Sequence, residues 1–449
     1  MIRTISKIAV LFVFASSYIS AQERVTIVGD SLVGGKIDGE SIREVFGNVV
    51  ITQGDVTVTC RKALQFLNRN EFELTGNVVA TQDTITLFTE KGRYFGKFKM
   101  ARSDTSIMMY DGNVVLSADF GTHFFDEKKS VFTSDVELFD SLSTLKSDEL
   151  IYYNDLDKAV ATGNVIIADS SSVIYADSLI HIRENNYTKA FENVKIKNPE
   201  NNTDIFCGML EDFGDSNYTK ISINPVMIKI DTSNSGRIDS LLIAANFMES
   251  FDDNNPRLKA TDSVEIVRGE FSSINERTVY FRDNDAISTY KKESEKKQPV
   301  MWFGNTQLLG DSVYIKLIDN QLNEIDIFEH SIIISKNENF DFRYDQISGD
   351  TLKLFFKESK LDFAEVFGGV LSIYYIYDEN APEGLIKATS KNAKIIFNDN
   401  KVNKVNLYVE PDSEYHPEKL VRGSEKEFTL PSFMLFENRP NKESILKRR

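Results

Sequence analysis

The chain has 449 residues, of which 52 are Lys or Arg and 68 are Asp or Glu, so its formal net charge at pH 7 is −16. Such an acidic surface repels phosphate groups, and nucleic acid is therefore excluded as an expected partner. Hydrophobic residues make up 41% of the chain, which is enough to bury a core and excludes a globally disordered protein.

Residues 1–21 predict a secretory signal peptide. Arg3 and Lys7 form a positive n-region, the run from Ile8 to Phe14 forms a short apolar core, and small residues precede Ala21, after which we expect cleavage. The apolar stretch is shorter than the roughly 20 residues of a membrane-spanning helix, and no cysteine follows it for lipid attachment. The sequence therefore predicts an exported protein.

A short phrase beginning with Gly-Asn-Val returns along the first half of the chain. Its copies lie at 47–51, 76–80, 112–116 and 163–167, with degenerate copies at 134–138 and 192–196. A start-to-start spacing of 29 residues recurs among them. Gly and Asn tolerate positive φ, so each phrase predicts a turn followed by a short strand of β-branched residues. One such unit cannot bury its face alone, so stacked units are expected to share a continuous core.

A second kind of strand, led by an acidic or small polar residue, alternates with these phrases, as at 146–153 and 175–182. In the second half, residues 310–317 are matched by residues 349–356, 39 positions later, with alternating apolar side chains. Such alternation predicts strands with one face in water. The sequence thus predicts an all-β protein, built as a stack of short strands with little helix.

The predicted organisation has four parts. The signal peptide covers 1–21, a first β domain covers 22–230, a second and diverged β-repeat domain of similar architecture covers 231–430, and a frayed tail covers 431–449. Residues 291–299 are charged and end in Pro299, which predicts an exposed loop or a linker.

These features together resemble the LptA/OstA family of periplasmic lipopolysaccharide transport proteins. The resemblance rests on the export signal, the Gly-Asn-Val strands and the acid-led strands, and it covers about residues 25–197. It implies a β-jellyroll, open at both ends, whose inner faces form an apolar groove for the acyl chains of lipopolysaccharide. It also implies a periplasmic location, head-to-tail stacking through the end strands with other Lpt-type proteins or a second copy, and no enzymatic activity, cofactor or metal.

One parity of the predicted strands is expected to face the groove. The chain and lipopolysaccharide are both anionic, so affinity must come from burying acyl chains, at about 0.8 kcal/mol per methylene. The same side chains could also simply form core. The predicted groove residues are Val49, Ile51, Val56, Val58, Val78, Ile85, Leu87, Val114, Leu116, Val165 and Ile167.

The two cysteines, Cys60 and Cys207, are predicted to be buried free thiols. They lie 147 residues apart in a stacked fold, whereas a disulfide needs Cα atoms within about 7 Å. We therefore expect no disulfide between them.

The sequence also raises four other functional interpretations. The run Gly29-Asp30-Ser31-Leu32 matches the signature of a serine hydrolase family, with Asp412 and His416 as distant partners, but residues 33–39 cannot start the helix which that site requires. The four histidines show no metal-ligand spacing. Two alternatives stay open, namely a structural β-solenoid or adhesin whose groove is filled by its own side chains, and a polysaccharide-active β-solenoid enzyme with facing carboxylates.

Overall fold

The computed structural model describes residues 23–112, 114–200, 202–232, 238–291, 297–318, 321–337, 339–358, 360–379, 381–398 and 401–449. The predicted signal peptide and residues 292–296 of the predicted loop lie outside the described residues. The described chain is nearly all strand, which confirms the predicted all-β class. It forms two compact units, residues 1–130 and 131–449, and the division falls within strand β11 (Lys129–Phe139). The predicted domain boundary at residue 230 stays a prediction.

The first unit is an antiparallel meander of strands. Each of β3 to β6 pairs with the next strand along the chain, and β6 then pairs with both β7 and β8 through its two halves. The strands are β1 (Thr26–Val28), β2 (Ser31–Ile37), β3 (Glu40–Gln53), β4 (Val56–Phe66), β5 (Glu71–Gln82), β6 (Ile85–Phe95), β7 (Met100–Ser103), β8 (Ile107–Asp111), β9 (Val114–Ala118) and β10 (Phe120–Phe124).

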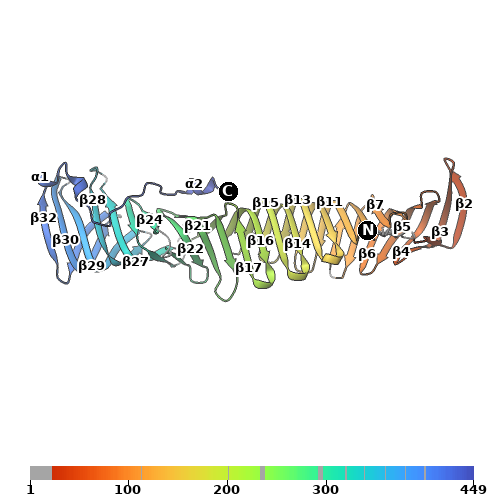
Figure 1. Ribbon diagram of the computed structural model, residues 1–449, viewed down its shortest axis with the longest axis horizontal. Coiled ribbons are helices and arrows are strands. Elements are labelled where there is room, and N and C mark those ends of the chain that lie inside the picture. The colour runs from red at the N-terminus through yellow and green to blue at the C-terminus, as the bar shows by residue number, and fades with distance from the viewer. Residues whose placement is uncertain are drawn as a thin grey trace, which may run out of the picture. The chain divides into compact units, whose positions relative to one another are not determined.

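The second unit continues in the same style, with consecutive antiparallel strands side by side (Figure 1). Its strands are β12 (Thr144–Tyr153), β13 (Lys158–Ala168), β14 (Val173–Ile182), β15 (Tyr187–Asn198), β16 (Thr203–Phe213), β17 (Tyr218–Ser222), β18 (Val226–Thr232), β19 (Ile238–Ala244), β20 (Phe247–Phe251), β21 (Arg257–Arg268), β22 (Phe271–Phe281), β23 (Ala286–Tyr290), β24 (Val300–Phe303), β25 (Thr306–Leu309), β26 (Ser312–Ile318), β27 (Gln321–Lys336), β28 (Tyr344–Lys357), β29 (Lys360–Asp378), β30 (Ala381–Asn398), β31 (Lys401–Tyr408) and β32 (Asp412–Pro417). Its short helices are η1 (Asn154–Leu156), η2 (Arg183–Asn185), η3 (Gly214–Ser216), α1 (Glu418–Val421), η4 (Glu425–Glu427) and α2 (Lys442–Leu446).

Within each unit, the long strands bend at a corner, so that their two halves belong to two different leaves. In β16, for example, the half at 209–213 pairs with β17 and the half at 203–206 pairs with β18. We call leaf A the leaf that holds β2, β7 and β10 in the first unit and β17, β20, β23 and β26 in the second. Leaf B holds β1, β8 and β9 in the first unit and β18, β19, β24 and β25 in the second. The groove of a unit is the space between its leaves, and the mouth is the side formed by the hairpins opposite the corners.

Most of the Gly-Asn phrases lie at these corners, inside continuous strands rather than before them, whereas Gly112 lies in the turn between β8 and β9. Gly163 and Asn164 have φ of 77° and 47°, yet both lie inside the continuous strand β13, where the pairing with β14 shifts by a bulge. Asn164 Nδ2 donates to Asp148 Oδ2 of the neighbouring strand at 2.8 Å. A Cβ on Gly163 would collide with the same carboxylate. The acid-led segment that contains Asp148 and the segment that begins with Gly163 and Asn164 therefore lie on neighbouring strands and meet at the same corner.

The same corner recurs through the chain. Asn48 donates to Asp30 at 3.0 Å in the first unit, and Asn193 donates to Asp177 at 2.6 Å in the second. Further along, Glu329 and His330 take the positive-φ positions, and His330 Nδ1 lies 3.0 Å from Asp311 Oδ2. The second half of the chain thus keeps the corner geometry without keeping the Gly-Asn letters.

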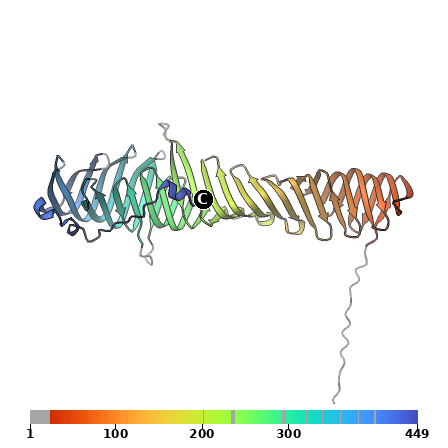
Figure 2. The ribbon, with the colours of Figure 1, turned by 90° about the horizontal axis from the view of Figure 1, so that it is seen from above.

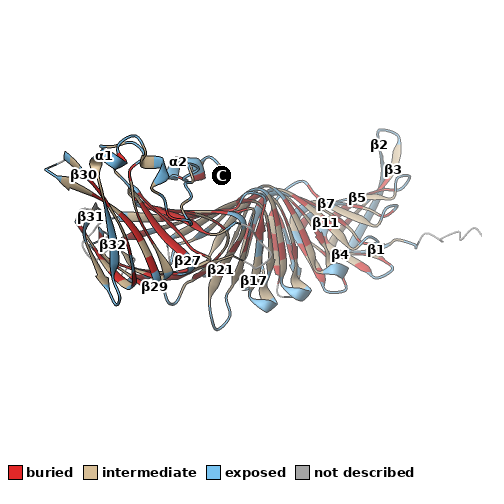
Figure 3. Cartoon of the chain, turned by 60° about the vertical axis from the view of Figure 1, so that its left-hand side comes forward, coloured by how far each residue is buried: buried red, intermediate tan, exposed pale blue. Residues whose placement is uncertain are grey.

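Buried residues recur along the strands, whereas many of the hairpins are exposed (Figure 3). In the second unit, parts of leaf B are buried on both faces. All four residues of β24 and all four residues of β25 are buried. A second layer must therefore cover the outer face of leaf B.

That layer is the C-terminal strap, which we define as residues 418–449 (Figure 2). Two glutamines fasten it: Gln346 Nε2 donates to the Phe428 carbonyl at 3.0 Å, and Gln307 Nε2 donates to the Met434 carbonyl at 2.7 Å. At its end, Ile445 is fully buried against Leu242 and Val267 of leaf B. Residues 431–449 are therefore packed rather than frayed, which corrects the sequence prediction.

Candidate binding groove

The predicted groove residues lie on the inner faces of their units. The nine in the first unit are buried, with at most 5% of any residue exposed, as is Val165 in the second unit. Ile167 is half-buried. These residues pack closely with their neighbours, so their contact with lipid stays a prediction.

In the first unit, the mouth is closed by contacts between the leaves. Gln53 of leaf B donates to the Gly96 carbonyl of a leaf A hairpin at 2.9 Å, and Tyr94 donates to Gln53 at 2.7 Å. Lys128 of a leaf A hairpin lies 3.4 Å from Asp83 of a leaf B hairpin. The interior behind these contacts is filled by buried side chains.

In the second unit, by contrast, the leaves separate enough to leave a cavity of about 340 Å³, which we call cavity 1. Hairpin residues of both leaves form its rim, among them Asp169 of leaf B and Asp252 of leaf A. Its floor is mainly apolar and comes from both leaves: Ile174, Ile196, Ile205, Leu210, Ile221, Met227 and Leu258.

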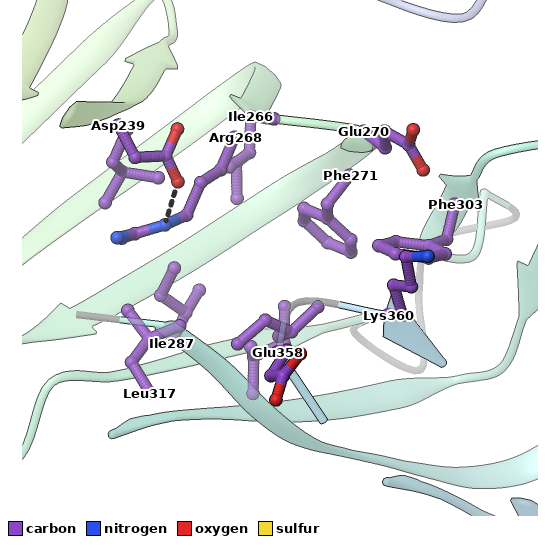
Figure 4. Close-up of a pocket in the computed structure, with 14 residues that line it drawn as sticks. Asp239, Ile266, Arg268, Glu270, Phe271, Ile287, Phe303, Leu317, Glu358 and Lys360 are labelled. Carbon is purple, nitrogen blue, oxygen red and sulfur yellow. Dashed lines mark hydrogen bonds and ion pairs between the residues drawn. The ribbon is translucent and has the colours of Figure 1, made fainter. Parts of the chain in front are cut away.

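A second cavity of about 180 Å³, cavity 2, lies further along the same groove. In Figure 4, the Arg268–Asp239 pair lies at one side of cavity 2, and the rings of Phe271 and Phe303 lie at the other. The remaining floor is aliphatic and comes from leaf B and leaf A: Leu241, Ile266, Ile287, Ile315, Leu317 and Leu322.

Charges at the rim of cavity 1 largely compensate one another. Arg282 pairs with Asp252 at 2.6 Å and also donates to Ser250. Burial raises the pKa of Asp212, which accepts a hydrogen bond of 2.6 Å from Thr219. An apolar floor below a compensated polar rim suits an amphipathic ligand better than a small ion.

A polar bridge joins the leaves between the two cavities. Lys229 of leaf B donates to the Tyr280 hydroxyl of leaf A at 2.8 Å and lies 3.3 Å from Asp285. Tyr280 in turn donates to Asp285 at 2.9 Å. Burial opposes the charge on Lys229, but its hydrogen bond to Tyr280 and the nearby carboxylates raise its pKa overall, so it stays protonated.

The bridge continues along leaf B toward cavity 2. Lys229 lies 3.5 Å from Asp231, which pairs with Arg268 at 3.1 Å, and Arg268 pairs with Asp239 at 3.2 Å. We call these four residues, together with Tyr280 and Asp285, the polar bridge. Neither the cavities nor the bridge was predicted from the sequence. One feature of the sequence could have indicated the bridge. Asp231 and Asp239 are acidic residues in largely apolar strands, and Lys229 lies in the same strand as Asp231.

The serine-hydrolase motif is part of a corner. Asp30 accepts from the Asn48 side chain, and Ser31 begins strand β2 instead of a helix. His416, its distant partner by sequence, lies 3.4 Å from Glu414 in the second unit. Within the described residues, no group of three or more His, Cys, Asp or Glu side chains is arranged to hold a metal ion.

Cys60 and Cys207 are both buried and free. Burial raises the pKa of Cys60 to about 11 and that of Cys207 to about 12, so neither thiol ionises at neutral pH. Both behave as small apolar core residues.

The part of the chain that the structure describes contains no helix both long and apolar enough to cross a membrane. The two-leaved strands, the corner repeat and the apolar cavities define a β-jellyroll-type protein with an internal groove. Residues 25–155 match the family model described as OstA-like protein, so this part of the chain is similar to the LptA/OstA-like family. A comparison with curated proteins gave no match. The family serves lipopolysaccharide transport, is periplasmic in general and is generally non-enzymatic.

Proposed function

We infer that this protein is a non-enzymatic, periplasmic lipopolysaccharide-binding protein that carries acyl chains toward the outer membrane in the groove of its second unit. The observation that carries the proposal is the pair of neighbouring cavities with apolar floors in that groove. Each methylene buried there contributes about 0.8 kcal/mol, and the acidic head groups stay at the rim, outside the anionic body.

The end strands support partner binding by strand addition. β2 pairs only with β3 among the described strands, and its exposed residues include Leu32 and Val33, each 55% exposed. An exposed edge strand with apolar side chains recruits another strand. We propose that another Lpt-type β-jellyroll protein, or a second copy, pairs with this edge.

Photo-cross-linking tests the groove directly. A photoreactive side chain at Ile196, on the floor of cavity 1, should capture lipopolysaccharide. Its matched control is Lys195 on the opposite face of the same strand, where the side chain pairs with Asp204 at 2.9 Å. Capture at position 195 that equals capture at position 196 would refute groove binding.

A structural solenoid is the second candidate, and the filled interior of the first unit favours it for that part of the chain. It predicts that neither position captures lipid. The polysaccharide-enzyme reading gains no support from the rim of cavity 1, because Asp252 is paired with Arg282 and Asp212 is held by Thr219.

A further inference from the structure

The polar bridge lies at the boundary between the two cavities on both leaves. On leaf B, cavity 1 ends with Met227 and Lys229 of β18, and cavity 2 begins with Asp239 and Leu241 of β19. On leaf A, cavity 1 ends with Tyr280 and Arg282 of β22 and its hairpin, and cavity 2 begins with Ile287 of β23. Asp285 lies in the hairpin between β22 and β23.

The strand register places the two basic residues of the bridge, Lys229 and Arg268, in one row across neighbouring strands. Lys229 is the cross-strand partner of Leu241, and Leu241 is the partner of Arg268. Lys229 and Arg268 are therefore two strand spacings apart, roughly 10 Å. Lys229 lines cavity 1 and Arg268 lines cavity 2, so this one row of side chains borders both compartments.

The middle of the bridge is buried, and its two outer carboxylates are partly exposed. The side chains of Asp231 and Arg268 are 5% and 7% exposed, Tyr280 is 4% exposed and the side chain of Lys229 is 13% exposed, whereas those of Asp239 and Asp285 are 34% and 35% exposed. An alkyl chain lying across such a group would separate buried charges from their partners and leave them unsatisfied, which opposes binding strongly. The same chain meets no such obstacle on the apolar floor of either cavity.

We propose that the Lys229–Tyr280–Asp285 contact determines acyl-chain length: it divides the groove into two compartments, and one alkyl chain fills one compartment without crossing to the other. This inference rests on the proposed function. It makes Lys229 a specificity-determining residue and assigns Tyr280 a positioning role, because its hydroxyl links the ammonium group to Asp285.

The test measures binding of single-chain lysophospholipids of increasing saturated chain length to the full chain, below their micellar concentrations. In the natural protein, each added methylene should raise affinity about fourfold until the chain reaches the bridge, and affinity should then level off. In Lys229→Met, which keeps length and removes charge, affinity should continue to rise with longer chains. Lys259→Met is the matched control, because Lys259 pairs with Glu249 on leaf A and lines neither cavity.

Tyr280→Phe provides a second variant that keeps the ring and removes only the linking hydroxyl, so the test survives if Lys229→Met does not fold. It should move the levelling-off point in the same direction by a smaller amount. Binding that levels off at the natural chain length in both folded variants overturns the inference and leaves the proposed function intact. Failure of the natural protein to bind any chain overturns both.

Discussion

At the scale of single residues, the corners explain why this sequence repeats. Two consecutive residues take positive φ, and an aspartate on the neighbouring strand accepts a hydrogen bond from the second of them, as Asp148 does from Asn164. Asn is favoured because it tolerates this backbone conformation and supplies the amide.

Asn164→Val should destabilise the protein by about 2 kcal/mol, since a β-branched residue is strained at a φ of 47° and the bond to Asp148 is lost. Asn164→Gly relieves the strain and loses only the bond, so it should cost less than about 1 kcal/mol. Urea unfolding measures both. Equal losses would show that backbone conformation does not matter at this corner.

His123 makes stability depend on pH. It is 1% exposed, lies 2.8 Å from the Ser130 hydroxyl and packs edge-on against Phe125, and burial lowers its pKa to about 4. The unfolded chain binds a proton near pH 6.5 and the folded chain does not, so stability is full above that pH and falls as the pH drops toward 4.

This difference should cost about 2 kcal/mol between pH 7.5 and pH 5. His123→Gln does not titrate, so its stability should fall less over the same range, with the remaining loss including that from His181, whose pKa is also lowered by burial. Denaturant melts at the two pH values compare the proteins. A loss of the same size in His123→Gln would mean that His123 is not the titrating group.

At the scale of elements, the strap turns leaf B of the second unit into an inner layer. Arg439 donates to the carbonyls of Glu270 and Gly304, each at 2.6 Å, and so ties together two hairpins of leaf B. Gly304 follows Phe303, and Glu270 and Phe303 both line cavity 2. The strap therefore stabilises the rim of the groove from outside.

Ile445→Asp should release the end of the strap, because it places an unpaired charge against Leu242 and Val267. We expect a loss of about 3 kcal/mol and faster amide exchange in β19. Lys447→Ala, at a side chain 72% exposed, should change stability by less than about 0.5 kcal/mol. Unchanged exchange in β19 of Ile445→Asp would contradict a packed strap.

Much of this element-level structure could be predicted from the sequence. Strand composition and the 29-residue phrase predicted the all-β class and the stacking, because turn chemistry and β-branched runs are local properties. The strap could not be predicted, since its partners, such as Gln307 for Met434, lie more than 100 residues away. Runs such as Ile332–Ile334, buried on both faces, were its one local sign.

At the scale of the whole molecule, the two units differ in their interiors: the first is filled by side chains, and the second contains the two cavities. Val49 and Ile51, which alternation places on one face of their strand, are buried, but alternation cannot tell a filled interior from a hollow one. The separation of the leaves depends on side-chain volumes on two strands that face each other. The cavities consequently lie between residues 169 and 360, largely beyond the predicted groove residues.

The net charge of −16 affects how the protein can bind lipopolysaccharide. The anionic body disfavours the head groups of lipopolysaccharide, so binding must depend on the apolar floors of the second unit. Raising ionic strength screens charge repulsion and strengthens burial of apolar surface, and should therefore tighten binding. Titrations of lipopolysaccharide at low and high salt check this, and weaker binding at high salt would indicate head-group recognition instead.

The most direct measurement of the central claim is mass spectrometry of the lipid that the purified full-length protein retains after incubation with lipopolysaccharide. The groove of the second unit predicts retained acylated lipid, and replacing Leu258, on the floor of cavity 1, by Asp should remove it while the protein stays folded. Protein that retains no lipid, or that retains as much lipid after Leu258→Asp, would contradict the claim.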